Sequence, residues 1–571
     1  MTKIHHVILS ALCLLLLMGC KSKKDISIAE WGYIDSAWVA ADSSVFYVNE
    51  YQPIPKLVIG ITVDQMRYDY LERFKSDFGV GGFNRLMNGG VSLEQMHYHY
   101  VPTYTGPGHA SIFTGSAPTY HGIIANDWYD KKADALQYCA KDPNVMGVGT
   151  SSESGKMSPV HLISTTIGDE LRMHTQMRSK VIGISLKDRG AILPAGRMAN
   201  AAYWYIGGAE DVWATSSWYG MSSLPQWVQD FNARGYGKNC LTETWNLLYP
   251  DSIYNESMPD NNPYEAPFKG MIKPVFPYSL AELAKLNNLY DLMKATPCGN
   301  TMSMEFAKAA ILGEQMGADE IPDMLCLSFS ATDYVGHQFG PHSRELQDTY
   351  LRLDKDIENF LSFLDETIGY GNYLLFLSSD HGAGNNPAWM MENKLSAGYF
   401  VSDRLEEMVE ERLIKKYGAG NWVLNESNLN IFLNRVLIEE KKLSLKTIQQ
   451  EVASWCLEME GVHSAFTHAE LSYSIARNSL SEKVQLGFDQ ARSGDVIYTL
   501  QPGWMEYGRQ GTTHGSGYDY DTHVPAIFYG TGVGMDYNTI TGKYSIADIA
   551  PTICHYLGIP NPSGCIGKII E

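Results

Sequence analysis

Thr105 lies in a glycine-rich stretch that could bind an anion. Gly106, Pro107 and Gly108 follow it, between an extended run (MHYHYVPTY) and a helix-like run (HASIFTG). Proline is tolerated in the first turn of a helix, where its missing N–H would have no intrahelical partner. Thr105 should therefore stand at a helix N-terminus, with free backbone N–H groups beside its hydroxyl. An ordinary helix cap has the same local sequence, so other parts of the chain must supply the remaining chemistry.

Aspartate and histidine residues recur at spacings that suit metal binding. Asp333 and His337 are four residues apart, which places both on one face of a helix. Asp380 and His381 are adjacent, and the glycines that follow permit the bend that joint ligation requires. His514 lies in a glycine-rich loop. Each residue alone could be a loop aspartate or a surface histidine, but together they indicate a metal site.

Two cations in the segment SLKDRG could hold an anion. Lys187 and Arg189 are two residues apart, so an extended segment would direct both side chains to the same side. Neighbouring cations repel each other unless an anion binds between them, and the planar guanidinium group suits phosphate oxygens. Two solvated surface cations with Asp188 as counter-ion are the alternative that this segment leaves open.

These residues need a scaffold that brings several strand ends together. Buried strands are predicted for the apolar runs at 56–63, 181–186, 324–330, 373–379 and 524–530. Helical patterns alternate with them, most clearly at 343–368, which predicts an α/β fold with a mostly parallel central sheet flanked by helices. Ligands of such sheets bind beyond the strand ends, where Asp64, Lys187, Asp333 and Asp380 would lie.

Two segments interrupt this pattern. Residues 200–300 are rich in Trp, Tyr, Gly and Pro and indicate an inserted loop-and-hairpin region, whereas residues 390–505 indicate a small α+β cap. The predicted order is a signal peptide (1–19), a tether and lead-in (20–54), and a core in three parts (55–199, 301–389 and 506–571) that the two insertions separate.

The composition limits the partners of the protein. The chain has 571 residues and a formal net charge of −20, which excludes a duplex nucleic acid as partner because such proteins present basic faces. An anionic substrate would require a locally positive site. Of nine cysteines, seven follow position 20, and none forms a CxxC pair that would suggest a thiolate zinc site.

The N-terminus has the pattern of an export signal. Lys3 precedes an apolar run at 7–18 that is too short to span a bilayer. The segment LMGC at 17–20 resembles a bacterial lipoprotein cleavage box, with Cys20 as the lipidated residue. We expect an exported protein, in the periplasm or the cell envelope, with a lipid anchor at Cys20. Plain secretion with cleavage near Gly19 is the alternative.

The order of these motifs resembles that of the alkaline phosphatase superfamily. The segments YTGPGHASI, HGIIANDW, SLKDR, TDYVGH, SSDHG and THGS look like those of the PafA-type bacterial alkaline phosphatases. The similarity covers residues 55–571, with the motifs in order and similarly spaced.

The resemblance implies two Zn²⁺ ions and a threonine nucleophile. Thr105 would attack phosphorus, and the phosphoryl oxygens would be held by Asn126, Lys187 and Arg189. The ligands of one zinc would be Asp333, His337 and His514. The ligands of the other would be Asp64, Thr105, Asp380 and His381. We prefer His514 to the nearby His523, because His523 opens a predicted strand.

These roles imply hydrolysis of phosphate monoesters, which are small-molecule substrates. Two zinc ions, three aspartates and the Lys187/Arg189 pair give the site a net charge of about +3, which suits a monoester dianion. Relatives that cleave diesters typically lack this Lys/Arg pair. A phosphodiesterase or nucleotide pyrophosphatase stays open as an alternative, because Trp213, Trp218 or Tyr219 could shape a nucleoside slot.

Two other classes of protein fit the sequence less well. Sulfatases share the fold but need a C/S-x-P-x-R signature, and Thr105 stands in TGPGH instead. A non-catalytic metal- or phosphate-binding lipoprotein would predict a broken constellation, yet every position is filled. The sequence leaves the oligomeric state open.

Overall fold

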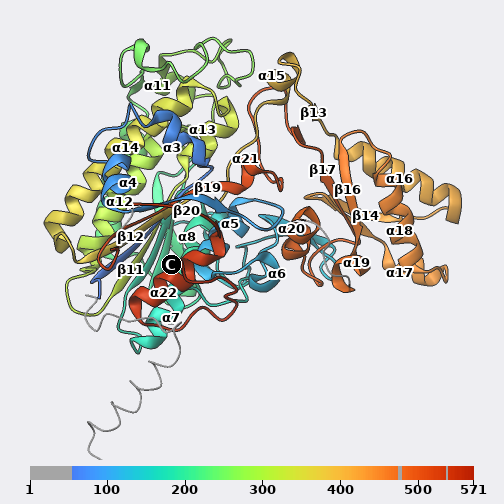
Figure 1. Ribbon diagram of the computed structural model, residues 1–571, viewed down its shortest axis with the longest axis horizontal. Coiled ribbons are helices and arrows are strands. Elements are labelled where there is room, and N and C mark those ends of the chain that lie inside the picture. Colours follow the sequence, from blue (N-terminus) through green and yellow to red (C-terminus); the bar gives the residue numbers. More distant parts are fainter. Residues whose placement is uncertain (1–53, 474–478, 535–537) are drawn as a thin grey trace, which may run out of the picture. The chain divides into compact units, whose positions relative to one another are not determined.

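The computed structural model describes residues 54–473, 479–534 and 538–571 (Figure 1). The predicted signal peptide, Cys20 and nearly all of the tether lie outside these residues. None of the helices within the described ranges combines the length and the hydrophobicity needed to cross a membrane.

Ten strands form one mixed central sheet, in the order β20-β2-β19-β12-β1-β11-β6-β7-β8-β5. The middle strands β12, β1, β11, β6 and β7 are parallel, and β19 is antiparallel to both of its neighbours. The strand bounds are β1 Leu57–Val63, β2 Val91–His97, β5 Gly147–Val148, β6 Val181–Ser185, β7 Ala201–Ile206, β8 Val212–Ser216, β11 Asp323–Phe329, β12 Tyr373–Ser378, β19 His523–Gly530 and β20 Thr539–Ser545. The five predicted strands are all present, so the α/β prediction is confirmed.

Helices cover both faces of this sheet. One face carries α3 (Tyr68–Phe74), α4 (Phe83–Gly89), α9 (Gln226–Ala233), α11 (Leu280–Ala284), α12 (Cys298–Glu314), α13 (Ala331–Phe339) and α14 (Arg344–Leu364). The other face carries α5 (Thr105–Thr114), α7 (Ile167–His174), α8 (Asp188–Ala195) and α22 (Ile549–Leu557). Short helices in the connections are α6 (Pro118–His121), α10 (Tyr236–Cys240), α15 (Pro387–Glu392) and α21 (Asp519–Thr522).

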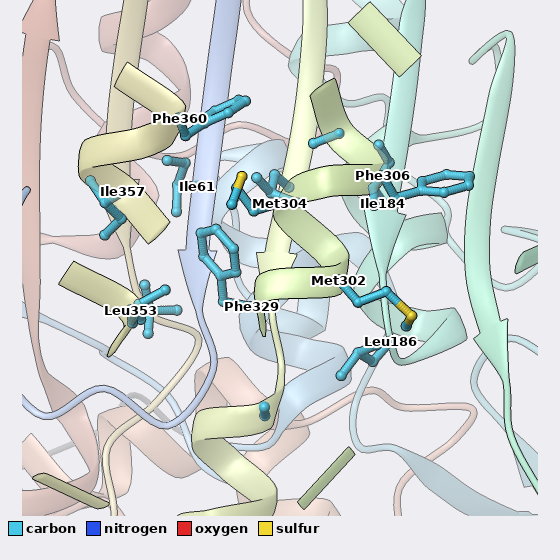
Figure 2. Packing of buried hydrophobic residues seen from close by; sticks show 14 of the residues in the cluster. Ile61, Ile184, Leu186, Met302, Met304, Phe306, Phe329, Leu353, Ile357 and Phe360 are labelled. Atoms are coloured by element: carbon cyan, nitrogen blue, oxygen red, sulfur yellow. The ribbon is translucent and has the colours of Figure 1, made fainter. Parts of the chain in front are cut away.

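The central strand β1 shows why the sheet is buried on both sides. Leu57, Ile59 and Ile61 point into the cluster under α12 and α14, whereas Val58 points into the cluster on the opposite face. Figure 2 shows how α12 and α14 place Met304 and Phe360 against Ile61. Such apolar runs without polar alternation are typical of parallel strands covered on both faces.

Gly60 allows helix α5 to pack closely on β1. A Cβ atom at this position would lie 2.5 Å from Phe376 and 2.8 Å from Phe113. Those contacts are too short for any side chain, so the strand must carry a glycine where Phe113 of α5 crosses it. This packing fixes the height of α5, and therefore of its N-terminus, above the sheet.

The segment 200–300 differs from the prediction of an inserted loop-and-hairpin region. Its first two strands, β7 and β8, extend the central sheet beside β6. Aromatic strands in a buried position caused the error, because a run such as AAYWYI has no turn signal and all six of its residues are buried. A disulfide bond between Cys240 and Cys298 then ties this segment to the start of α12.

Residues 398–505 form a compact α+β cap with its own core. Its four-stranded sheet has the order β14-β15-β17-β16, with bounds Val423–Ser427, Asn430–Leu433, Val496–Leu500 and Val462–Thr467. Helices α16 (Ser402–Tyr417), α17 (Arg435–Glu440) and α18 (Leu445–Cys456) lie together beside this sheet in Figure 1, and two more helices are α19 (His468–Tyr473) and α20 (Ser479–Gly487). Where the chain enters and leaves the cap, β13 (Gly398–Tyr399) pairs with β18 (Trp504–Met505).

Two glutamates, Glu265 and Glu345 of α14, are buried close to each other. Glu265 is 1% exposed, and neither of its carboxylate oxygens has a hydrogen-bond partner among the described residues. Glu345 accepts a hydrogen bond from Tyr278 at 2.5 Å. Burial raises the pKa of Glu265 to about 11, with Glu345 as the next cause, and burial raises the pKa of Glu345 to about 8.

We predict that Glu265→Gln stabilises the protein at alkaline pH. The folded pKa values of this pair lie above the ordinary value of 4.5, so the folded state holds protons that the unfolded state loses. Stability from the pair is complete below the unfolded pKa and falls as pH rises through 8. At pH 9 the variant should melt about 2 °C or more above the wild type, with a smaller difference at pH 5. The exposed control Glu282→Gln should show no such trend, and an equal shift at both pH values would contradict the prediction.

Candidate active site

The predicted site residues meet at the edge of the central sheet where its parallel strands end. Asp64 follows β1, Lys187 follows β6 and Asp380 follows β12. Asp333 lies in the first turns of α13, directly after β11. Because these strands are neighbours in the sheet, residues far apart in the sequence are brought into one cluster.

Thr105 is the first residue of α5, as the Gly-Pro-Gly sequence predicts. Its hydroxyl Oγ1 lies 3.5 Å from Nε2 of His381. The backbone N–H of Gly106 donates to Oδ1 of Asn126 at 2.8 Å, which fixes that side chain beside the helix N-terminus. A Cβ atom at Gly108 would lie 2.2 Å from the carbonyl oxygen of Asp380, so a glycine is needed for α5 to reach the strand end.

Three aspartates and three histidines form a cluster beside Thr105, in which the aspartates and His381 are buried and His337 and His514 are half-buried. Two groups within it have ligand atoms within 4.8 Å of one another, namely Asp333/His337/His514 and Asp64/Asp333/His381. Nε2 of His337 lies 3.2 Å, and Nε2 of His514 lies 3.7 Å, from Oδ1 of Asp333. His523 lies outside the cluster, where it stacks on His97 and bonds to the carbonyl of Glu94.

The three histidines all present the same ring nitrogen to the cluster. Nδ1 of His337 bonds to the carbonyl oxygen of Thr512 at 2.8 Å. Nδ1 of His381 bonds to Gly382 O at 2.9 Å, and Nδ1 of His514 bonds to Thr103 O at 2.7 Å. A carbonyl oxygen only accepts, so each Nδ1 carries the proton and each Nε2 keeps a lone pair that faces the carboxylates. Metal-binding histidines are oriented in this way.

Two carboxylate oxygens of this cluster are buried without a hydrogen bond from any described residue. Oδ1 of Asp64 and Oδ2 of Asp380 are buried without a hydrogen-bond partner among the described residues. Burial raises the pKa of Asp64 above its usual value, and the neighbouring Asp333 and Asp380 raise it further. Buried like charges are stable only with a cation between them, so the donor set fits divalent metal ions with N and O ligands, such as Zn²⁺.

The structure divides the predicted ligands slightly differently from the prediction. Asp333 belongs to both groups, and Asp380 falls outside the second group. Oδ2 of Asp380 nevertheless lies 3.4 Å from Nε2 of His381, beside Thr105. Asp333 is shared because α13 carries it into the centre of the cluster, which sequence spacing does not reveal.

Lys187 and Arg189 lie at the start of a helix and not, as predicted, in an extended segment. Lys187 is the N-cap residue of α8, and Arg189 lies in its first turn. Nζ of Lys187 donates to Asp64 and to Asp333, both at 2.6 Å. Burial lowers the pKa of Lys187, but Asp333 and Asp64 outweigh burial and raise it. Arg189 donates to the hydroxyl of Tyr138 at 3.1 Å, and that hydroxyl donates in turn to the carboxylate of Asp188. Asp188 therefore contacts Tyr138 and is not a direct counter-ion of the two cations, as the alternative had it.

Two residues that the sequence analysis gave no role hold the cluster in place. Gln65 donates from Nε2 to Asp333 at 2.8 Å and from its backbone N–H to Asp380 at 3.1 Å. It has a left-handed φ of 65°, which is unusual for a residue other than glycine. His109 bonds to Thr105 O and lies 3.2 Å from Asp380. Its position one helical turn after Thr105 was the only signal in the sequence.

The aromatic residues considered for a nucleoside slot are engaged elsewhere. Trp213 is 1% exposed and stacks on Phe306 at 4.2 Å in the core. Trp218 donates to the carbonyl of Arg197, whose guanidinium covers its ring. The Tyr219 hydroxyl is buried. None of the three presents a free ring to the cluster, which removes that support for a nucleotide substrate.

Comparison with known proteins agrees with this geometry. Residues 58–524 match the family model described as type I phosphodiesterase / nucleotide pyrophosphatase. The chain belongs to this family. The match spans the core from β1 to the start of β19, together with the cap.

Similar proteins carry two kinds of name. Alkaline phosphatase PhoV of Synechococcus elongatus is 43% identical, over 90% of this chain and 92% of that protein. Alkaline phosphatase PafA of Elizabethkingia meningoseptica is 42% identical, over 91% of this chain and 94% of that protein. A protein of Myroides odoratus named calcium-transporting ATPase is also 42% identical, over 90% of this chain and 94% of that protein.

The fold matches that of PafA. The PafA crystal structure superposes with a TM-score of 0.86 at 40% identity, covering 91% of this chain and 99% of that chain. The large mixed sheet with flanking helices is therefore the alkaline phosphatase fold of PafA, as the motif order predicts.

Proposed function

We propose that this protein is a zinc-dependent alkaline phosphatase that hydrolyses phosphate monoesters to inorganic phosphate and an alcohol. The observation that carries the proposal is the cluster in which three histidine Nε2 atoms face three carboxylates beside Thr105. The names of PhoV and PafA support it, as does the family membership.

Asp333, His337 and His514 would hold one ion. Asp64 and His381 of the second group, together with the neighbouring Asp380 and the Thr105 hydroxyl, would hold the other, and Asp333 lies within reach of both ions. When bound, such ions supply positive charge that favours the Thr105 alkoxide and stabilises the attacking and leaving oxygens.

Thr105 is placed to attack phosphorus. Its hydroxyl stands at the N-terminus of α5, where the backbone N–H groups favour an anionic phosphoryl group. Attack forms a bond from Oγ1 to phosphorus and breaks the bond to the alcohol oxygen, leaving a phosphothreonine. Water then attacks phosphorus, releases inorganic phosphate and regenerates Thr105. Phosphoryl transfer of this kind depends mainly on positioning and charge.

Asn126, Lys187 and Arg189 would bind the non-bridging oxygens. Asn126 uses its Oδ1 to accept from Gly106, so its NH₂ group is left to donate. Lys187 donates two of its three N–H groups to Asp64 and Asp333, which leaves the third to donate to a phosphoryl oxygen. Arg189 is steadied by Tyr138 and keeps further donors in its planar fork.

A crystal structure of a PafA variant supports these assignments. The variant carries substitutions at one threonine, one asparagine, one lysine and one arginine of PafA. These are the residue types, in the same chain order, of Thr105, Asn126, Lys187 and Arg189 in this protein.

We expect the zinc-loaded enzyme to prefer phenyl phosphate to methyl phenyl phosphate by several orders of magnitude in kcat/KM. A monoester dianion has a third non-bridging oxygen for Arg189 and Lys187 to bind. Arg189→Ala should lower kcat/KM for the monoester by about 100-fold or more and for the diester by much less. Arg178→Ala, an exposed arginine, is the matched control. Comparable rates for both esters would favour the phosphodiesterase alternative of the same family.

Thr105→Ala separates an enzyme from a binding protein. We expect the variant to lose turnover by about a thousandfold or more, because the nucleophile is gone. Metal analysis should still find bound zinc, since the aspartates and histidines remain. Thr119→Ala, at a half-buried threonine that is not part of the cluster, should keep full activity. If the wild type binds zinc and phosphate but turns over no ester, the non-catalytic alternative holds.

We also propose that the protein is exported and anchored through Cys20, which rests on the LMGC box at 17–20. In cells fed with labelled palmitate, the wild type should carry the label and Cys20→Ala should not. Equal labelling of both proteins, or of neither, would contradict the lipoprotein assignment.

A further inference from the structure

A cavity of about 190 Å³ lies between the active site and the cap. Its walls come from three parts of the chain. The first is the segment that leads into α5, with Val101 and Tyr104, and the second is the loop at 513–518 around His514. The third is the cap sheet, with residues 427–430 and 497–500.

The walls of the cavity adjoin the proposed phosphoryl site. Tyr104 immediately precedes Thr105, and Ala125 immediately precedes Asn126. His514 is also a lining residue, and its Nε2 lies 3.7 Å from Oδ1 of Asp333. The cap is attached at the same place, because Nδ2 of Asn428 donates to the carbonyl of Asp127 at 2.8 Å. An alcohol esterified to the phosphoryl group therefore has this cavity as a neighbour.

The cavity combines aromatic rings with negative charge. Its aromatic lining residues are Tyr104, Trp128, Phe432, Tyr498, Trp504, Tyr518 and Tyr520. Glu506 and Asp521 are its acidic residues, and among the described residues no lysine or arginine lines it. Arg492 lies over the ring of Trp128 at 5.0 Å, but its guanidinium donates to the carbonyls of Gly122 and His161.

The acidic groups are not neutralised from within the cavity. Glu506 accepts a hydrogen bond from the backbone N–H of Ser402 at 3.3 Å. Burial raises the pKa of Tyr104, and the nearby carboxylates of Glu506 and Glu426 raise it further. Asp521 is 1% exposed, and its Oδ1 has no hydrogen-bond partner in the described part of the chain. A neutral alcohol in this cavity would bring no positive charge to Glu506 or to the buried Asp521, whereas a cation would.

We propose that this cavity binds the alcohol part of the substrate and that this part is a small alkylammonium group, as in choline. The inference rests on the proposed phosphatase function. Aromatic faces attract ammonium ions through the ring quadrupole, and the carboxylates add a direct charge interaction. A volume of about 190 Å³ is below the range of about 300–1,000 Å³ that is typical of pockets for larger ligands. A nucleoside is therefore too large to be enclosed, whereas a trimethylammonium group is of suitable size.

The test compares two monoesters of the same shape on the zinc-loaded protein. Phosphocholine and 3,3-dimethylbutyl phosphate differ in one atom, because a carbon replaces the charged nitrogen. We expect kcat/KM for phosphocholine to exceed that for the neutral ester by about tenfold. Since the phosphoryl groups are identical, the ratio reports only on the site for the alcohol.

Substitutions at Glu506 test the origin of the preference. Glu506 is exposed, so the changes should not disturb the core, and glutamine keeps an acceptor for Ser402. Glu506→Gln should lower the ratio several-fold, and Glu506→Lys should reverse it. Glu411→Gln, an exposed glutamate on α16 of the cap, should leave the ratio unchanged.

Binding of choline without turnover gives a second measurement. Calorimetry should show that free choline binds the wild type more tightly than it binds Glu506→Lys, and that 3,3-dimethylbutanol binds both proteins weakly. Equal or faster hydrolysis of the neutral ester by the wild type would overturn the inference. Turnover of phenyl phosphate without turnover of phosphocholine would also overturn it while leaving the phosphatase proposal intact. Loss of all monoester turnover would overturn the proposed function itself.

Discussion

The structure depends on the burial of three carboxylates at one edge of a sheet. Asp64, Asp333 and Asp380 are almost fully buried, and moving a charged group out of water costs several kcal/mol even after relaxation. Lys187 offsets part of this cost through its bonds to Asp64 and Asp333. The three histidines supply uncharged ring nitrogens as ligands, and hydrogen bonds from Nδ1 to backbone carbonyls fix the orientation of each ring. The surrounding sheet, with apolar layers on both faces, supplies the rigidity that holds like charges together.

That rigidity is built from a few close contacts around the nucleophile. Gly60 lets Phe113 pack directly on the sheet, and Gly108 lets the first turn of α5 pack against the backbone of Asp380. A second layer of polar residues then orients the cluster, with Gln65 joining Asp333 to Asp380 and His109 joining Asp380 to the backbone of Thr105. The position of the Thr105 hydroxyl is therefore set by the core as well as by its immediate neighbours.

Sequence patterns were sufficient for the scaffold and for the residue types at the strand ends. The apolar runs predict β1, β6, β11, β12 and β19, and the four-residue spacing of Asp333 and His337 places both on α13. The sequence did not reveal how Lys187 is used, since its bonds to Asp64 and Asp333 arise from the order of strands in the sheet.

Other features also depended on pairing between distant segments. The strand β7 departs from the predicted insertion because a buried aromatic strand has no polar alternation to recognise. Gln65 and His109 carry no motif of their own. The cavity beside the cap combines segments near 101, 428 and 514, so no local pattern could predict it.

The shared position of Asp333 also has a consequence for assembly. The cluster takes its members from Asp64 near the start of the described chain to His514 in its last part, and both ligand groups contain Asp333. A nascent chain that ends before residue 514 can therefore present only part of the donor set. A complete metal site would therefore have to wait until His514 has been synthesised. For a chain that crosses a membrane before it folds, the ions available at its destination, rather than those at the ribosome, would decide what the site holds.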